Sequence, residues 1–177
     1  MTGSDPAVFA EPPSGLSRAD FVARFGGIYE HSAWVAERLW ASGLTPAHDS
    51  VAGLRDAMGT IVKNADQDAK LALIRAHPDL AGRLAVAGEL TEASTAEQAS
   101  AGLDHCTPEE LARFQDLNGA YQARFGFPFI MAVRNRSRQE ILAAFEARLA
   151  NSPEQEFETA MAEIHKIALL RLLDLAE

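Results

Sequence analysis

The sequence predicts an all-α fold: a single domain of about eight to nine helices, with one buried extended segment near residues 127–133. Hydrophobic residues make up 47% of the chain, Ala and Leu are prominent, and β-branched residues are few. This composition favours helices over sheets. Apolar residues recur with the helical period between recognisable caps. A chain of 177 residues suits one domain, which can bury about 70% of its unfolded surface.

The N-terminal stretch is expected to lie outside this domain. Residues 1–15 are small, acidic and rich in Pro and Gly, which predicts a disordered tail. The helical domain then covers residues 16–177, without an internal repeat or linker.

Four helices are expected in the first half of the domain. The first begins at Ser17, with Asp20 as its capping partner, and ends at Gly26. A second helix carries Trp34 and ends at Gly43. Apolar spacing predicts two more, at about residues 49–63 and 66–76, where the proline at position 78 stops the last one.

The second half begins with short helix and loop over residues 79–92 and then a helix over 94–105. Thr107 followed by a proline and two glutamates is a strong helix start, and Gly126 ends that helix. Ser137 or Arg138 opens the next helix, and Ser152 opens the last. The apolar run at 127–133 has no partner strand in view, so we expect buried extended chain between two helices.

Charge and cysteine content exclude several classes of function. The formal net charge is −9 and no basic block occurs, which argues against nucleic-acid binding. Cys106 is the lone cysteine, so an internal disulfide is excluded and a reducing cytoplasm is expected. The sequence shows no signal peptide, no apolar stretch of membrane-spanning length and no terminal Ser-Lys-Leu. The scattered histidines lack metal-ligand spacing, so no metal is predicted.

Three segments depart from plain helix packing. The first is His77 to Gly82, where a histidine precedes a proline at a helix end. That placement holds the residue in an extended conformation and suits acid–base chemistry near neutral pH. Composition alone favours the alternative, an ordinary surface histidine at a helix terminus.

The second segment runs from Ser94 to Gln98. Positions i, i+3 and i+4 share a helix face, so Ser94, Glu97 and Gln98 are expected to converge at a helix N-terminus with free backbone N–H groups. The alternative uses the same spacing: Ser94 and Glu97 form a capping box. On spacing alone the capping interpretation is preferred.

The third segment runs from Phe125 to Arg134. Its extended backbone leaves N–H and C=O groups that a flat heterocycle with amide edges can pair with. Arg134 closes the run, and a guanidinium is a natural partner for a carboxylate or enolate oxygen. The alternative is a buried connector bonded to neighbouring helices, with Arg134 in a surface ion pair.

Together these segments resemble the decarboxylases of uric acid breakdown that act on 2-oxo-4-hydroxy-4-carboxy-5-ureidoimidazoline (OHCU). The similarity covers nearly all of residues 16–175. The matching motifs, in order, are residues 25–32, 34–36, 77–82, 94–98, 101–103, Leu117-Asn118, Tyr121 and 125–130.

The resemblance implies an all-α carboxy-lyase of purine catabolism that forms (S)-allantoin, needs no cofactor and is usually a homodimer in the cytoplasm. It implies that His77 is the catalytic acid/base, assisted by Glu97 and Arg134. The residues it implies as substrate contacts are Pro78, Ser94, Thr95, Ala96, Glu97, Gln98, Ile130, Met131, Ala132, Val133 and Arg134.

Three other interpretations stay open at this point. One is a non-catalytic helical module that binds a purine-like or ureide ligand. Another is a metal-dependent ureide hydrolase, which the ligand spacing argues against. The third is a purely structural helical domain, which explains the apolar run ending in Arg134 least well.

Overall fold

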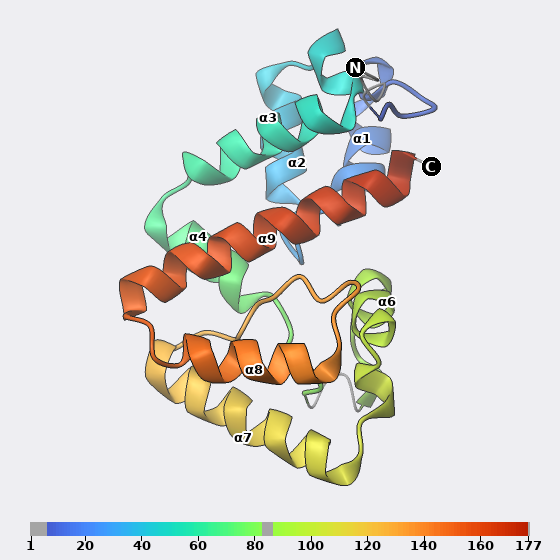
Figure 1. Ribbon diagram of the computed structural model, residues 1–177. Coiled ribbons are helices and arrows are strands. Elements are labelled where there is room, and N and C mark those ends of the chain that lie inside the picture. Colours follow the sequence, from blue (N-terminus) through green and yellow to red (C-terminus); the bar gives the residue numbers. More distant parts are fainter. Residues whose placement is uncertain (1–6, 83–86, 177) are drawn as a thin grey trace, which may run out of the picture. The chain divides into compact units, whose positions relative to one another are not determined.

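The computed structural model describes residues 7–82 and 87–176. These residues form eight α-helices and no strand, and a lone bridge joins Val8 to Ser50 (Figure 1). The helices are α1 (Arg18–Phe25), α2 (Trp34–Ser42), α3 (Val51–Lys63), α4 (Gln67–Arg75), α6 (Glu92–Ser100), α7 (Pro108–Phe125), α8 (Arg138–Arg148) and α9 (Pro153–Ala176). The all-α prediction is therefore confirmed.

Within this all-α fold the chain groups into two compact units. The first unit comprises Met1–Ala76 and His165–Glu177, and the second comprises His77–Ile164. The long helix α9 contributes its first half to the second unit and its second half to the first.

In the first unit, local capping sets where the helices begin. The Ser17 side chain accepts the backbone N–H of Asp20 at the start of α1, as predicted. Ser50 and Asp66 cap α3 and α4 in the same way. Apolar residues three or four positions apart then bury one face of each helix.

Residues 7–15 are ordered, which differs from the disordered tail expected there. Phe9 is only 4% exposed, and its ring packs edge-on against Phe25 with centroids 5.2 Å apart. The backbone N–H and hydroxyl of Ser14 both donate to the Asp49 carboxylate at 2.8 Å. One buried aromatic side chain thus anchors a segment whose composition indicates disorder. Residues 1–6 lie outside the described chain.

In the second unit, the predicted starts of α7, α8 and α9 are confirmed. Reciprocal capping boxes join Thr107 to Glu110 and Ser137 to Glu140. Ser152 bonds to the residue three positions on in the same reciprocal manner. Gly126 ends α7 in the left-handed conformation (φ 75°) that glycine adopts without strain.

The predicted helix over 94–105 is wrong at both ends. The N-cap of α6 is Thr91, whose side chain accepts the Ser94 N–H, so the Ser94 capping box does not form. At the other end, Gly102 takes a left-handed conformation (φ 70°), and residues 103–105 continue as a separate 3₁₀ turn. The predicted short helix and loop at 79–92 includes residues 83–86, which lie outside the described chain.

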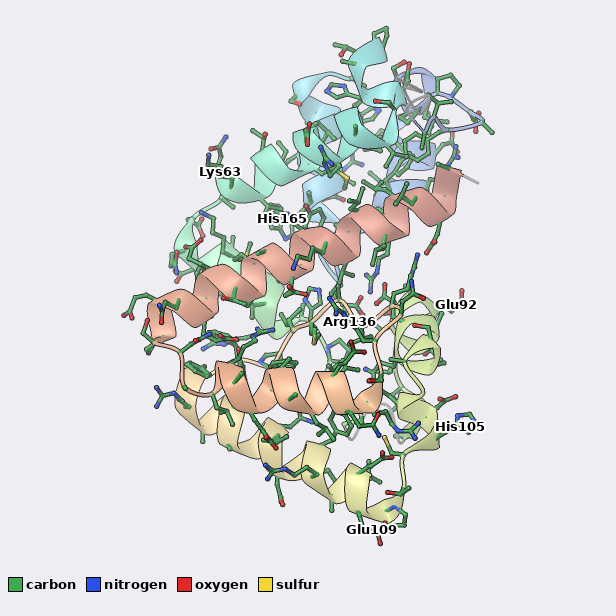
Figure 2. All side chains as sticks on the ribbon, in the orientation of Figure 1. Lys63, Glu92, His105, Glu109, Arg136 and His165 are labelled. Atoms are coloured by element: carbon green, nitrogen blue, oxygen red, sulfur yellow. The ribbon has the colours of Figure 1, made fainter. Side chains whose placement is uncertain are left out.

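Charged side chains are mostly on the outer faces of the helices. Lys63, Glu92 and Glu109 are exposed and extend away from the ribbon (Figure 2). The exceptions among the described arginines and glutamates are Glu30, Glu156 and Arg171, which are buried.

Candidate active site

All three segments singled out in the sequence lie in the second unit. They are the loop that follows α4, part of α6, and the segment between α7 and α8.

The loop at residues 77–82 begins where α4 ends. The helix stops at Arg75 and is capped by Ala76, so His77 follows the helix end directly, as the proline at position 78 predicts. His77 is 8% exposed and counts among the buried polar residues. This burial contradicts the alternative of an ordinary surface histidine.

Gln98 of α6 holds this loop through both ends of its side-chain amide. Its Oε1 accepts the backbone N–H of Ala81 at 3.0 Å, and its Nε2 donates to the backbone carbonyl of Asp79 at 3.2 Å. Gln98 was predicted as a substrate contact, and the structure shows that its amide already binds protein backbone.

The same loop is bound from α7 and is tightly turned. Asn118 Nδ2 donates to the carbonyl of Leu80 at 2.9 Å, and Gln122 Nε2 donates to the Asp79 carboxylate at 3.0 Å. Ala81 has a positive φ of 48°, and a Cβ at Gly82 would lie 2.5 Å from the Cβ of Asp79. The backbone that follows His77 is therefore fixed by side chains from two helices.

Helix α6 presents the predicted residues on different faces. Ser94 is 4% exposed and Gln98 5%, so these two share the buried face, as expected for positions i and i+4. Glu97 is half-buried, whereas Thr95 and Ala96 are exposed. Because Thr91 caps α6, these residues lie inside the helix, and the predicted convergence on a free N-terminus is wrong.

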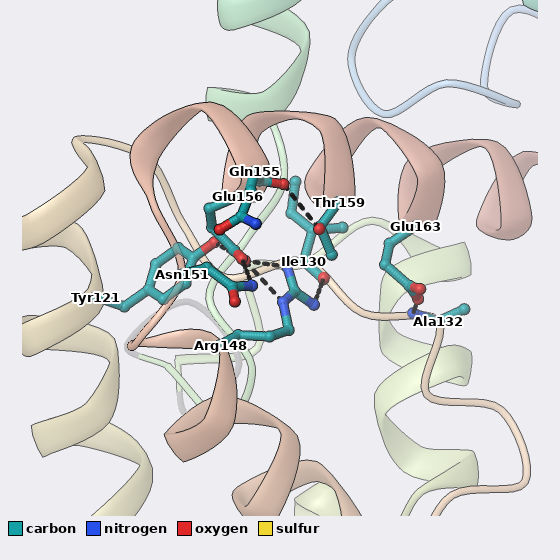
Figure 3. A network of polar contacts seen from close by, with 9 residues as sticks. All are labelled: Tyr121, Ile130, Ala132, Arg148, Asn151, Gln155, Glu156, Thr159 and Glu163. Atoms are coloured by element: carbon teal, nitrogen blue, oxygen red, sulfur yellow. Dashed lines mark hydrogen bonds and ion pairs between the residues drawn. The ribbon is translucent and has the colours of Figure 1, made fainter.

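The segment at 127–133, predicted as buried extended chain, connects α7 to α8 without forming a strand and is buried except at Met131 and Ala132, which are half-buried. Phe129 is fully buried, Ile130 is 3% exposed and Val133 4%. Residues from α8 and α9 bind its backbone: Arg148 Nη1 donates to the Ile130 carbonyl at 2.7 Å, and the Ala132 N–H donates to Glu163 Oε2 at 2.8 Å (Figure 3). Arg134 follows this segment and is half-buried.

A buried polar cluster lies beside this connector, centred on Glu156 of α9 (Figure 3). Glu156 has no exposed surface, and Oε1 of its carboxylate accepts from Tyr121 at 2.5 Å and from Arg148 Nε at 2.7 Å. Asn151 Nδ2 donates to its other oxygen at 2.9 Å. Three hydrogen-bond donors and a paired guanidinium thus satisfy this buried carboxylate. Burial and the neighbouring Glu156 carboxylate raise the pKa of Tyr121, so its phenol stays a proton donor.

Two cavities border the loop at 77–82. One, of about 370 Å³, is lined by Ala81, Thr95, Gln98 and Cys106 among others. The second, of about 540 Å³, is lined by Asp79, Gly82, Asn118 and Gln122 with neighbouring residues of α7. Neither of these two cavities is lined by His77, Glu97 or Arg134.

In residues 7–82 and 87–176, no cluster of three His, Cys, Asp or Glu side chains has a metal-binding arrangement. Across the same residues, no helix combines the length and apolarity needed to cross a membrane.

Of the residues that bind these segments, Arg148, Glu156 and Glu163 were not identified from the sequence, and Asn118 was named only within a matching motif. Asn118, Arg148, Glu156 and Glu163 resemble ordinary helix-surface residues in their local context, yet each binds backbone or another buried group. The available signal was weak: Glu156 is four positions before buried Ala160 and eight before Ile164, which places a charge within a buried stripe.

Comparison with known proteins identifies the family. The family model for OHCU decarboxylase matches residues 14–173. A curated relative from Haloferax volcanii, named 2-oxo-4-hydroxy-4-carboxy-5-ureidoimidazoline decarboxylase, is 49% identical over 159 residues, which is 90% of each chain.

Two solved structures are similar as well. A crystal structure of (S)-allantoin synthase superposes with a TM-score of 0.74 at 40% identity, covering 92% of this chain and 52% of that one. A structure of OHCU decarboxylase in the presence of (S)-allantoin has a TM-score of 0.65 at 26% identity, covering 84% and 94%. The three sequence segments, their shared place in the second unit and these matches together show that the chain belongs to the OHCU decarboxylase family.

Proposed function

We propose that this protein decarboxylates OHCU to (S)-allantoin in uric acid degradation. The observation that carries the proposal is the family match across residues 14–173, together with the relative that shares 49% of its sequence and carries that name. The buried His77, on a loop bound by α6 and α7, is the group suited to proton transfer near neutral pH.

The reaction asks for orientation, charge stabilisation and one directed proton. The substrate loses its carboxylate as CO₂ from a ring carbon that also carries a hydroxyl. The electron pair of the broken bond moves to the neighbouring carbon–nitrogen double bond, so the substrate is its own electron sink. The nitrogen that receives the pair is protonated, the hydroxyl loses its proton so that its carbon becomes a carbonyl, and a proton delivered to the neighbouring ureido-bearing carbon sets the (S) configuration. We therefore expect no metal or organic cofactor.

Each predicted site residue has a part in this scheme. His77 polarises the hydroxyl and later delivers the proton. Glu97 orients His77 or holds the ureido N–H groups, and Arg134 binds the oxygen that gains negative charge. Ser94 and the 130–133 backbone match the amide edges of the substrate. Gln98 acts through the loop that it binds. Contacts through Pro78, Thr95 and Ala96 stay a prediction.

A coupled assay tests the activity directly. OHCU is generated from urate in the cuvette, the protein is added, and the handedness of the allantoin is followed by circular dichroism. Spontaneous decay gives a racemate, so we expect rapid formation of one enantiomer. A racemate formed at the uncatalysed rate would contradict the proposal. Ligand binding without consumption of OHCU would favour the non-catalytic binding module.

The His77→Asn variant tests the assignment of the proton donor. General acid–base catalysis contributes about 100- to 10,000-fold, and we expect a loss of that size with an unchanged circular dichroism spectrum. His105→Asn is the matched control, because the His105 side chain is 80% exposed. Equal turnover by the two variants would remove His77 from the mechanism.

Homodimer formation and a cytoplasmic location are part of the same proposal. Cys106 is the lone cysteine of the chain, which fits a reducing compartment. Light scattering after size exclusion is expected to give twice the chain mass of 19.1 kDa.

A further inference from the structure

The segment at 130–133 is bound on one side by two charged residues. Arg148 Nη1 donates to the carbonyl of Ile130 at 2.7 Å, and the N–H of Ala132 donates to Glu163 at 2.8 Å. Residues 128–133 form no helix, turn or bend and have no positive φ, and in such extended chain the polar groups of residues two apart point to the same side. Arg148 and Glu163 therefore fix the rotation of this segment about its own axis.

The opposite edge of the segment makes no hydrogen bond to the part of the chain that the structure describes, up to the carbonyl of Val133. Among the described residues, no hydrogen bond is made to the N–H or C=O of Met131 or to the N–H of Val133. The carbonyl of Val133 accepts from Arg136 N in a turn at 2.9 Å, which ends this edge. In chain order, this edge offers the Met131 N–H as a donor, the Met131 C=O as an acceptor and the Val133 N–H as a donor. It therefore complements a planar group that presents an acceptor, a donor and an acceptor.

Arg148 is itself held rigidly. Its Nε and Nη2 lie 2.7 and 2.5 Å from Glu156 Oε1, and its guanidinium is 4.2 Å from the centroid of the Phe129 ring. Phe129 in turn stacks on Phe145 with centroids 3.8 Å apart. A guanidinium fixed by a carboxylate and an aromatic ring has little freedom, so its bond to Ile130 is a fixed reference for the segment.

Glu163 lies on the same helix as Glu156, two turns further on. Seven residues separate the two carboxylates, and residues at that spacing share one face of an α-helix. One face of α9 thus supplies both the anchor of Arg148 and the acceptor for Ala132 (Figure 3).

We propose that Arg148 and Glu163 are positioning residues of the active site, which direct the Met131–Val133 backbone edge toward the amide edge of the substrate. This inference rests on the proposed function and extends it to two residues outside the predicted site. Both residues act through the backbone that they bind.

The first test uses Glu163→Ala and Glu163→Gln, with Glu158→Ala as the control. Glu158 is an exposed glutamate of the same helix. A displacement of about 1 Å in a substrate-binding group can cost about 100-fold, so we expect Glu163→Ala to lower kcat/KM tenfold to a hundredfold, mainly through KM. Glu163→Gln retains an oxygen acceptor for the Ala132 N–H and should recover most of the loss. Glu163→Ala with the same KM as Glu158→Ala would overturn the proposal, as would equal losses in Glu163→Ala and Glu163→Gln.

The second test compares Arg148→Lys with Arg171→Lys. Both arginines are paired with buried glutamates, but Arg171 binds the carbonyl of Gly27 in the first unit. The ammonium group of lysine keeps the positive charge, but it lacks the planar guanidinium geometry that lets arginine bind the carboxylate and the carbonyl together. We expect Arg148→Lys to raise KM about tenfold and Arg171→Lys to leave KM within about twofold of the wild type. Equal changes in KM would overturn the proposal.

Amide hydrogen exchange separates this inference from the proposed function. The Ala132 N–H should be protected in the wild type and exchange at least tenfold faster in Glu163→Ala, whether or not the protein turns over OHCU. (S)-allantoin titration by NMR should show weaker binding in the same variant. A wild type without turnover refutes the proposed function. If the wild type turns over OHCU but the Glu163→Ala variant keeps both the Ala132 protection and the allantoin affinity, the positioning roles are refuted and the proposed function stands.

Discussion

Each compact unit contains a buried arginine–glutamate pair, and helix α9 supplies the opposite partner in each. In the first unit α9 provides Arg171, whose Nη1 lies 2.8 Å from the Glu30 carboxylate and donates to the carbonyl of Gly27 at 3.2 Å. In the second unit α9 provides Glu156, and Arg148 of α8 joins it to the carbonyl of Ile130.

The two pairs solve the same physical problem. A non-helical segment has carbonyls without partners from regular secondary structure, and these need hydrogen bonds when they are buried. An arginine with five donors can bind a carboxylate and a carbonyl together. The pairs differ in the segment that they hold. Residues 26–33 carry no candidate site residue, whereas residues 130–134 carry several, so the same arrangement supports the fold in one unit and the candidate site as well in the other.

Removing either arginine should have the largest effect on stability. Arg148→Ala and Arg171→Ala each leave a glutamate with at most 2% exposure without its guanidinium, and breaking such a pair costs about 3–5 kcal/mol. Urea denaturation at low temperature measures the loss. Activity per folded molecule, measured where both variants remain folded, should fall only for Arg148→Ala. A folded Arg171→Ala variant without activity would show that the comparison between the units is wrong.

The side-chain hydrogen bonds of Tyr121 and Tyr29, one in each unit, should differ in strength. Tyr121 donates to the buried Glu156 carboxylate, and loss of a hydrogen bond to a charged group costs about 1.5–3 kcal/mol. Tyr29 bonds to Nδ1 of His165 at 2.9 Å, a contact between neutral groups worth about 1 kcal/mol. Denaturation midpoints of Tyr121→Phe and Tyr29→Phe compare them. A larger loss for Tyr29→Phe would contradict the greater strength assigned to the hydrogen bond between Tyr121 and Glu156.

Much of the fold could be predicted because its signals are local. The caps at Ser17, Thr107 and Ser137 involve residues three positions apart, and such hydrogen bonds form within one helical turn. The start of α6 was predicted wrongly because Ser94 and Glu97 have the same spacing as a capping box, while the actual cap, Thr91, lacks a glutamate three positions on.

The site could be predicted only in part, because its support is non-local. His77 was identified from its place before a proline, and its burial agrees with a specialised role. Arg148 and Ile130 are 18 residues apart, and Ala132 and Glu163 are 31 apart. Contacts over such separations depend on how helices pack, which single-residue propensities and spacing do not encode.

The helix caps should give smaller and similar effects in the two units. Ser17→Ala in the first unit and Thr91→Ala in the second each remove an N-cap acceptor, at a cost of about 1 kcal/mol. Thr95→Ala is the comparison for Thr91, because the exposed Thr95 hydroxyl donates to the Thr91 carbonyl at 2.9 Å but caps no helix end. If Thr91→Ala were as stable as Thr95→Ala, the reassigned start of α6 would be wrong.

The smallest effect is a pH dependence that originates in the first unit. Burial lowers the pKa of His165 in the folded protein. In the unfolded chain the pKa of a histidine is about 6.5. Above that pH neither state holds the proton. As the pH falls below about 6.5, the unfolded chain gains a proton that the folded protein takes up only at lower pH, so stability decreases. Denaturation between pH 5 and 8 should show a shallower decline for His165→Asn than for the wild type and the exposed His105→Asn. Identical profiles would contradict this assignment.

The two hydrogen bonds of the Gln98 side chain restrict which amino acids position 98 can accept. Its side-chain amide donates to one backbone group and accepts from another two residues away, as a peptide unit of a neighbouring strand would. Glutamate would place a second acceptor against the carbonyl of Asp79, and asparagine is one carbon shorter. We therefore expect homologues that keep the loop after His77 to keep glutamine at this position, even though its sequence context is that of an ordinary helix residue.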